Sequence, residues 1–108
     1  MPNVYVINKA AHDFHEAERY GKLIYLSKGS INKYAVNRIF RQFTEALEKS
    51  QADDYILLTS LTVMNVIACC IFALKHNALN LLLFKDDGYT VRKLDLKGDD
   101  DGKETDSI

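Results

Sequence analysis

The chain has 108 residues, of which 47% are hydrophobic and 27% charged, and its formal net charge is −1. This length is typical of a single domain with its own hydrophobic core. A pI of 6.3 is far from the values typical of DNA-binding proteins. The only two cysteines, Cys69 and Cys70, are adjacent, which excludes a disulfide framework and the usual zinc sites. We expect both cysteines to be small buried hydrophobic residues.

The sequence also predicts where the protein is located in the cell and how far its domain extends. No apolar stretch reaches the roughly 18 residues of a membrane-spanning helix, and residues 1–9 lack the pattern of a secretory signal. We therefore expect a cytoplasmic protein without membrane contact. Residues 1–97 are predicted to form a single α/β domain. Residues 98–108 contain five acidic residues and one lysine, which predicts a disordered acidic tail.

Two strands and a short helical segment are expected at the start of the chain. Asn3–Asn8 and Lys22–Ser27 are rich in the β-branched, leucine and tyrosine residues that suit strands. Between them we expect a loop with one or two helical turns. Asp13 and Glu16 have the spacing of a capping box for these turns, and Gly21 would end them.

The next segment, Asn32–Ser50, is the clearest amphipathic helix. Its apolar residues recur at helical spacing, and polar residues occupy the other face. Ser30 or Asn32 is the expected N-cap, because a short polar side chain can accept a hydrogen bond from the first turn.

The rest of the chain is organised around Asp54–Phe84. Tyr55–Leu58 and Leu79–Phe84 have the apolar runs of strands buried on both faces. Between them, eleven of the twelve residues of Val63–Leu74 are apolar, which predicts a buried helix. Asn77 can adopt the left-handed conformation that ends a helix. Strand, helix and strand with short connections form a βαβ unit, so the two strands should be parallel.

The domain is expected to end in a hairpin. Lys85–Gly88 contains an Asp-Gly turn signal, and Tyr89–Leu96 alternates apolar and polar residues like an edge strand. The sequence therefore predicts an α/β fold. Its sheet is mixed and mainly parallel, with about five strands in the chain order β-β-α-β-α-β-β, two main helices, a C-terminal hairpin and the disordered acidic tail.

The predicted helix Val63–Leu74 is more apolar than a domain of this size requires. One face should contact the sheet, and the opposite face must be covered by something else. The Asn32–Ser50 helix could cover it within the monomer. The alternative is a homo-oligomer, most simply a two-fold dimer through Val63–Leu74.

The first candidate site is the turn before this helix, where ligands bind in open α/β sheets. Helix N-termini attract anions, and hydroxyl groups add hydrogen-bond donors. These features predict a phosphate or nucleotide site formed by Thr59, Ser60, Thr62 and Asn65. The turn has no glycine, so it is neither a P-loop nor a dinucleotide fingerprint. Ordinary helix capping by Thr62, Thr59 or Ser60 explains the same hydroxyl groups.

A second candidate is a basic stripe on the Asn32–Ser50 helix. Lys33, Asn37 and Arg41 recur every four residues, with Arg38 beside them. Such a stripe could contact the phosphates of a nucleotide or nucleic acid. The alternative is an ordinary solvated helix face.

The third candidate is the segment His12–Glu16. If it is helical, His12 and Glu16 share a face, and His12, Asp13 and His15 could support acid–base chemistry. The spacing matches no established zinc motif, so no metal and no cofactor are expected. The alternative is a polar loop with a local capping box.

A resemblance concerns Asp53–Ala68, the Val-Ile-Asn-Lys segment near the start, and His-Asp-Phe at residues 12–14. In these segments the chain resembles small uncharacterised proteins of phage and bacterial genomes. The resemblance implies a compact accessory protein and assigns neither activity nor site residues.

Two classes of function are therefore kept. The favoured class is a non-enzymatic, homo-oligomeric binding module for a protein partner or a phosphate-bearing ligand, with nucleic-acid binding as a weaker variant. The alternative is a small enzyme acting on nucleotide or phosphoester substrates through His12, Asp13 or His15.

Overall fold

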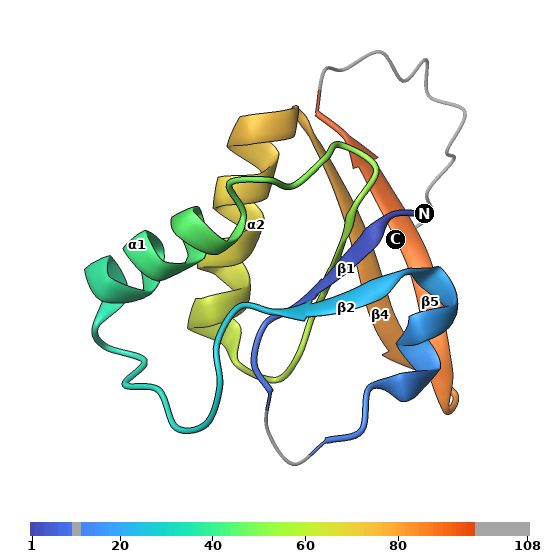
Figure 1. Ribbon diagram of the computed structural model, residues 1–108, viewed down its shortest axis with the longest axis horizontal. Coiled ribbons are helices and arrows are strands. Elements are labelled where there is room, and N and C mark those ends of the chain that lie inside the picture. The colour runs from blue at the N-terminus through green and yellow to red at the C-terminus, as the bar shows by residue number, and fades with distance from the viewer. Residues whose placement is uncertain (10–11, 97–108) are drawn as a thin grey trace, which may run out of the picture.

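The computed structural model describes residues 1–9 and 12–96. Its elements are, in chain order, β1 (Asn3–Val6), a 3-10 helix η1 (His15–Tyr20), β2 (Lys22–Tyr25), α1 (Val36–Ala46), β3 (Tyr55–Leu57), α2 (Thr62–His76), β4 (Ala78–Lys85) and β5 (Gly88–Asp95). This order confirms the predicted α/β fold (Figure 1). The predicted tail, residues 98–108, lies outside the described residues.

The five strands form one mixed sheet in the order β2-β1-β3-β4-β5. The pairs β1–β2, β1–β3 and β3–β4 are parallel, and β5 is antiparallel to β4. The predicted βαβ unit is therefore confirmed, with Ile56 of β3 opposite Leu81 of β4. As predicted, Asn77 ends α2 in the left-handed conformation, and its N–H donates to the Ala73 carbonyl.

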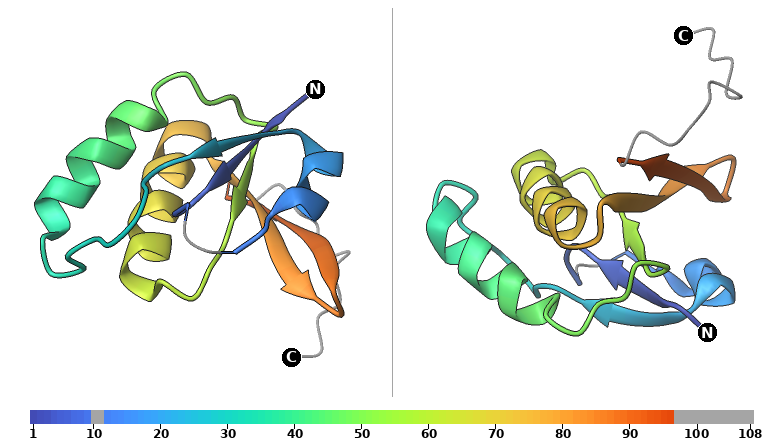
Figure 2. Two further views of the ribbon diagram at one scale, coloured as in Figure 1. Left: turned by 60° about the horizontal axis from the view of Figure 1, so that its bottom comes forward. Right: turned by 90° about the horizontal axis from the view of Figure 1, so that it is seen from above.

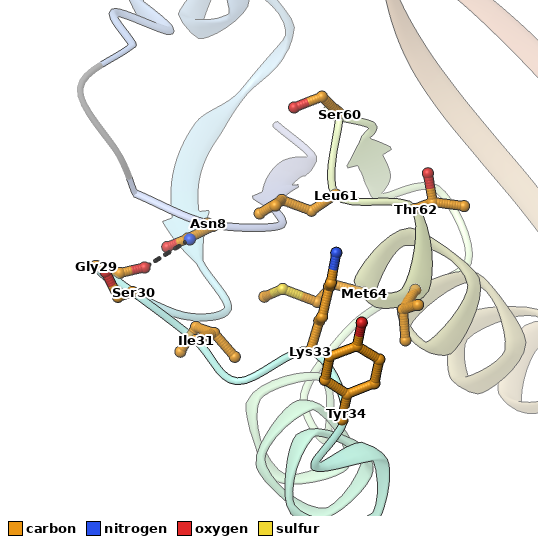
Figure 3. Close-up of a pocket in the computed structure, with 11 residues that line it drawn as sticks. Asn8, Gly29, Ser30, Ile31, Lys33, Tyr34, Ser60, Leu61, Thr62 and Met64 are labelled. Carbon is orange, nitrogen blue, oxygen red and sulfur yellow. Dashed lines mark hydrogen bonds between the residues drawn. The ribbon is translucent and has the colours of Figure 1, made fainter.

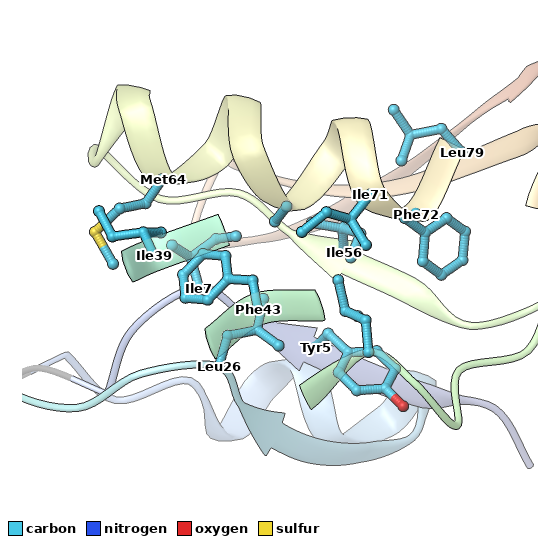
Figure 4. Packing of buried hydrophobic residues seen from close by; sticks show 12 residues of the cluster. Tyr5, Ile7, Leu26, Ile39, Phe43, Ile56, Met64, Ile71, Phe72 and Leu79 are labelled. Carbon is cyan, nitrogen blue, oxygen red and sulfur yellow. The ribbon is translucent and has the colours of Figure 1, made fainter. Parts of the chain in front are cut away.

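Two hydrophobic clusters lie on opposite faces of the sheet. The larger one joins the sheet to α1 and α2, and Phe43, Ile56 and Phe72 are fully buried in it (Figure 4). The smaller one lies on the other face, where Phe14 and Ala17 beside and within η1 cover the sheet. Figure 2 shows the two helices on one side and η1 on the other.

Both main helices begin without a side-chain cap, contrary to prediction. α1 begins four residues later than expected, and its N-cap is Ala35. Instead, the Asn32 side chain accepts a hydrogen bond from the Tyr34 N–H at 3.0 Å. Such local bonds favour a turn over a helix. The N-cap of α2 is Leu61 rather than Thr62, Thr59 or Ser60.

The predicted capping box at Asp13 is also shifted. The N-cap of η1 is Phe14, while Asp13 accepts a hydrogen bond from the His15 N–H at 2.9 Å. Gly21 follows η1, as predicted. A Cβ atom at Gly21 would lie 2.0 Å from the Pro2 carbonyl oxygen, so this position has no room for a side chain.

The hairpin turn forms at Lys85–Gly88 as predicted, and its central residues are Asp86 and Asp87. Both aspartates have positive φ, 51° and 65°, and Lys85 pairs with Gly88. This is the geometry of a type I′ turn, and aspartate tolerates it better than most residues. β5 lies at the edge of the sheet, as expected.

α2 is not buried on every side. Met64, Ala68, Ile71 and Phe72 are buried, but its outer side is open. α1 packs beside α2 on the same face of the sheet and does not cover that outer side (Figure 2). Intramolecular cover by the Asn32–Ser50 helix is therefore incomplete.

Cys70 is exposed, so its predicted burial is wrong, whereas Cys69 is partly buried. Within residues 1–9 and 12–96, no helix combines the length and hydropathy needed to cross a membrane.

Candidate ligand site at the edge of the sheet

The strand order places β2 and β3 on opposite sides of β1, so the chain connections run in opposite directions from this strand. From β1 the chain runs to β2 on one side, and from β2 it crosses through α1 to β3 on the other side. Ligands of open α/β sheets bind at the carboxyl ends of strands where connections diverge in this way. A pocket of about 560 Å³ lies at this edge (Figure 3). Its lining comes from the segments that follow β1, β2 and β3: Asn8, Gly29, Ser30, Ile31, Lys33, Tyr34, Ser60, Leu61, Thr62, Val63 and Met64.

Lys33 provides the positive charge of the pocket. It lies in the turn before α1, and its ammonium group points into the pocket toward the start of α2 (Figure 3). The ammonium nitrogen is 5.6 Å from the centre of the Tyr34 ring. Such a cation–π contact restrains a flexible side chain at an exposed position.

The start of α2 supplies hydrogen-bond donors to the same pocket. No side chain in the described part of the chain caps this helix, and its first backbone hydrogen bond runs from the Asn65 N–H to the Leu61 carbonyl. The N–H groups that precede Asn65 have no acceptor within the helix, and three of their residues, Thr62, Val63 and Met64, line the pocket. The partial positive charge of a helix N-terminus adds to that of Lys33.

Thr59 and Asn65 brace the turn before α2. The Asn65 amide donates to the Thr59 carbonyl at 2.7 Å, and its oxygen accepts from the Thr59 N–H at 3.2 Å. The Thr59 hydroxyl oxygen accepts from the Leu61 N–H. These two predicted ligand residues therefore hold the shape of the turn and are not in the lining of the pocket, whereas Ser60 and Thr62 are.

Asn8 is a pocket residue that the sequence analysis did not identify. Its side chain is only 6% exposed, and its amide donates to the Gly29 carbonyl at 2.9 Å. Its Oδ1 atom is buried and accepts no hydrogen bond from the described part of the chain. In the sequence, Asn8 is recognisable as the asparagine that ends the apolar run Val4–Ile7, at the carboxyl edge of a strand.

The predicted basic stripe is divided by the late start of α1. Lys33 lies before the helix, so it does not continue the helical spacing of Asn37 and Arg41. Asn37, Arg38 and Arg41 are exposed on α1 and are not in the lining of the pocket. Of the four residues, the structure brings only Lys33 to the α2 turn.

A second pocket, of about 540 Å³, lies on the other side of the β3–α2 turn. It brings His12 and Asp13 beside Thr59 and Ser60, while its remaining lining is mainly apolar and aromatic: Phe14, Leu57, Leu58, Leu83, Phe84 and Tyr89. Burial, and to a smaller extent the negative charge of Asp13, raises the pKa of the Tyr89 phenol.

His15 is not in the lining of this second pocket. It is exposed, with its ring 3.5 Å from Asp13 and 3.7 Å from Glu16. His12 lies before η1, so His12 and Glu16 do not share a helix face. Outside the undescribed residues 10–11 and 97–108, no group of three or more His, Cys, Asp or Glu side chains could hold a metal ion.

The opposite edge of the sheet, at the amino ends of the strands, also contains buried polar residues. The buried Asp54 carboxylate accepts from the N–H groups of Asn3 and Gln51, at 2.8 and 2.7 Å. The Asn80 amide donates to the carbonyls of Ala52 and Asp54. These bonds tie the start of β1 and β4 to the segment before β3, which is a structural role.

Ser50 and His76 form a further polar pair at this edge. The Ser50 hydroxyl donates to the Leu47 carbonyl, so the His76 Nε2–H donates to Ser50 Oγ, at 2.8 Å. Burial lowers the pKa of His76, and the charge of Lys75 lowers it further, with Asp54 acting in the opposite direction.

Residues 2–97 match the model of a protein family described as Phage Pam3 gp32-like protein. The chain belongs to this family. No curated protein and no solved structure matches the chain. The resemblance to small phage proteins is thereby confirmed, and the family description names no activity. The function of the chain must therefore be argued from the site itself.

Proposed function

We propose that this member of the family is a non-enzymatic binding module for a small phosphate-bearing ligand, acting as a homo-oligomer in the cytoplasm. The observation that carries the proposal is the convergence of three features in one pocket. These are the Lys33 ammonium group, the uncapped start of α2 and the hydroxyl groups of Ser60 and Thr62. Cation and helix N-terminus together favour an anion.

The geometry suits a phosphate at the start of α2. Lys33 would contribute its charge, and the hydroxyl groups of Ser60 and Thr62 would add donors. The proposed ligand is therefore a compound with an exposed phosphate or pyrophosphate group, such as a nucleotide.

Calorimetric titration of inorganic pyrophosphate and adenosine monophosphate into the protein tests this proposal. Lys33→Ala should weaken binding of both probes at least about tenfold, because a charge-assisted hydrogen bond contributes about 1.5–3 kcal/mol. Lys22→Ala is the matched control, since Lys22 is exposed at the amino end of β2, away from the pocket. Equal binding by wild type and Lys33→Ala, or no binding by either, would contradict the proposal.

A second candidate function is a small enzyme acting on nucleotides or phosphoesters. The observation that favours it is the second pocket, where His12 and Asp13 lie beside Thr59 and Ser60. Hydrolysis of bis(p-nitrophenyl) phosphate would test it. Loss of activity in His12→Ala but not in His15→Ala would support catalysis, because His15 is outside the lining of the pocket. The same low rate in wild type and both variants would exclude it.

A further inference from the structure

The outer side of α2 carries a seam that is apolar except at its last residue, the C-cap Asn77. Its residues are separated alternately by three and four positions: Val63, Val66, Cys70, Ala73 and Asn77. This is the seven-residue spacing of helices that pack against one another. Val66 is 57% exposed, and the neighbouring Leu74 is 86% exposed. Within residues 1–9 and 12–96, Val66 and Leu74 are therefore left uncovered, although the spacing of the seam is that of a contact surface.

The apolar surface continues from α2 onto α1. A shallow groove of about 350 Å³ separates Leu74 of α2 from Phe40 of α1, which is 49% exposed. Val36 of α1 and Val63 of α2 are partly exposed at the far end of the same helix pair. No charged residue occurs in α2 between Thr62 and Leu74. Depletion of charge is characteristic of the centre of a protein interface.

The size of this surface matches the requirement of a dimer. Six exposed apolar side chains form the surface: Val36, Phe40, Val63, Val66, Cys70 and Leu74. Together they offer roughly 500 Å² of accessible area, given about 150–250 Å² for a large side chain. A standard interface buries about 800 Å² per partner, of which about 65% is apolar in homodimers. A patch of this size is in the upper part of the range of about 300–600 Å² for the largest apolar patch of a monomer, and such patches are often functional.

We propose that a second copy of this chain covers the seam, with the two α2 helices packed antiparallel about a two-fold axis beside Cys70. The seam is centred on this residue, because Val63 and Asn77 are each seven positions away from it. An antiparallel pair places Val63 opposite Asn77 of the second copy and Cys70 opposite Cys70. It also keeps the two Lys33 charges, which lie near the α2 N-termini, at opposite ends of the pair.

This inference rests on the homo-oligomer of the proposed function and adds its surface, symmetry and partner residues. Both cysteines are on α2, but only Cys70 is exposed. Burial and the adjacent Cys70 raise the pKa of the Cys69 thiol to about 11. Cys69 therefore stays protonated at pH 8, and the nucleophilic form of a thiol is the thiolate.

Mild oxidation with copper phenanthroline at pH 8 tests the arrangement. Wild type and Cys69→Ser should form a disulfide-linked dimer on a non-reducing gel, and Cys70→Ser should not. A single cysteine at position 66, made as Val66→Cys in a Cys69→Ser, Cys70→Ser background, should not cross-link. In the antiparallel pair, the two cysteines at position 66 would be about 12 Å apart, which is beyond disulfide reach. In a parallel pair they would face each other. Cross-linking at position 66 would overturn the antiparallel arrangement.

Sedimentation analysis tests the surface without cross-linking. Wild type and Cys70→Ser should sediment as dimers, and Val66→Glu should sediment as a monomer. Phe84→Glu is the matched control, because Phe84 is 64% exposed at the end of β4 beside His12 and Phe14, away from α2, and this variant should remain dimeric. Because Val66 is exposed, Val66→Glu should keep the far-ultraviolet circular dichroism of the fold.

The two proposals fail in distinguishable ways. A dimer that survives Val66→Glu, or that does not cross-link through Cys70, would overturn this interface and leave the proposed oligomer standing. A wild-type monomer at all concentrations would overturn both the interface and the oligomer. Pyrophosphate binding is a separate readout, since the pocket is built within one chain, and Val66→Glu should retain it.

Discussion

Two buried asparagines mark the two edges of the parallel strands, and their hydrogen bonding differs. Asn80 is 7% exposed at the amino edge, where its amide donates to two backbone carbonyls. Asn8 is 6% exposed at the carboxyl edge, where its amide donates to one carbonyl and its Oδ1 accepts nothing from the described chain. Equal burial therefore accompanies unequal pairing of polar groups.

The difference indicates which edge holds the fold and which can bind a ligand. At the amino edge, the Asp54 carboxylate and the Ser50–His76 pair join segments that are distant in sequence. At the carboxyl edge, α2 begins without a cap and Lys33 points into the pocket. Polar groups paired within the chain stabilise it, whereas unpaired groups around a pocket are available to a ligand.

The largest effect on stability is expected at Asp54. Asp54→Ala leaves the N–H groups of Asn3 and Gln51 without their acceptor, so it should reduce the free energy of unfolding by about 2–4 kcal/mol. Urea denaturation measures this change. Asp53→Ala, at the exposed neighbouring position, should stay within about 0.5 kcal/mol of wild type. Similar losses of unfolding free energy in Asp54→Ala and Asp53→Ala would contradict the structural role assigned to the amino edge.

The two asparagines provide the direct comparison. Asn80→Ala deprives two carbonyls of a donor and should cost about 1–3 kcal/mol of unfolding free energy. Among the described residues, Asn8→Ala deprives one carbonyl, that of Gly29, of its donor and removes an acceptor that has no donor there, so it should cost less than about 1 kcal/mol. Thermal and urea denaturation of both variants give the ranking. A larger loss for Asn8→Ala would reverse the assignment of the two edges.

A smaller effect concerns pH. Because the folded pKa of His76 is below its ordinary value of 6.5, the unfolded chain binds a proton on this residue before the folded chain does. Stability should therefore fall as pH decreases through 6.5 toward the folded pKa, and this contribution should be constant above that range. Urea denaturation between pH 5 and 8 measures the slope. His76→Gln should reduce the slope, and an unchanged slope would exclude His76 as its source.

The fold could be predicted wherever a local pattern determines the structure. The apolar runs around α2 predicted β3, α2 and β4 because such runs are stable only inside a sheet or against it. Asn77 and the hairpin followed from residues that tolerate positive φ. The start of α1 did not follow, because the Asn32 side chain forms a local turn that competes with helical hydrogen bonds.

The candidate site was predicted only in part. Ser60 and Thr62 were identified because the turn between a strand and a helix has a known position in α/β sheets. Lys33 reaches the pocket from the turn before α1 and not from a helical stripe, because the local hydrogen bond of Asn32 delays the start of α1. Asn8 could not be ranked from sequence, since an unpaired acceptor depends on the packing of segments distant along the chain.

Nuclear magnetic resonance of ¹⁵N-labelled protein titrated with pyrophosphate tests the central claim most directly. The amide signals of Ser60, Thr62 and Met64, at the carboxyl edge, should shift in a saturable manner. The signals of Asp54 and Asn80, at the amino edge, should stay unchanged, and Lys33→Ala should weaken the response. Shifts confined to the amino edge, or none at all, would contradict the assignment of the ligand site.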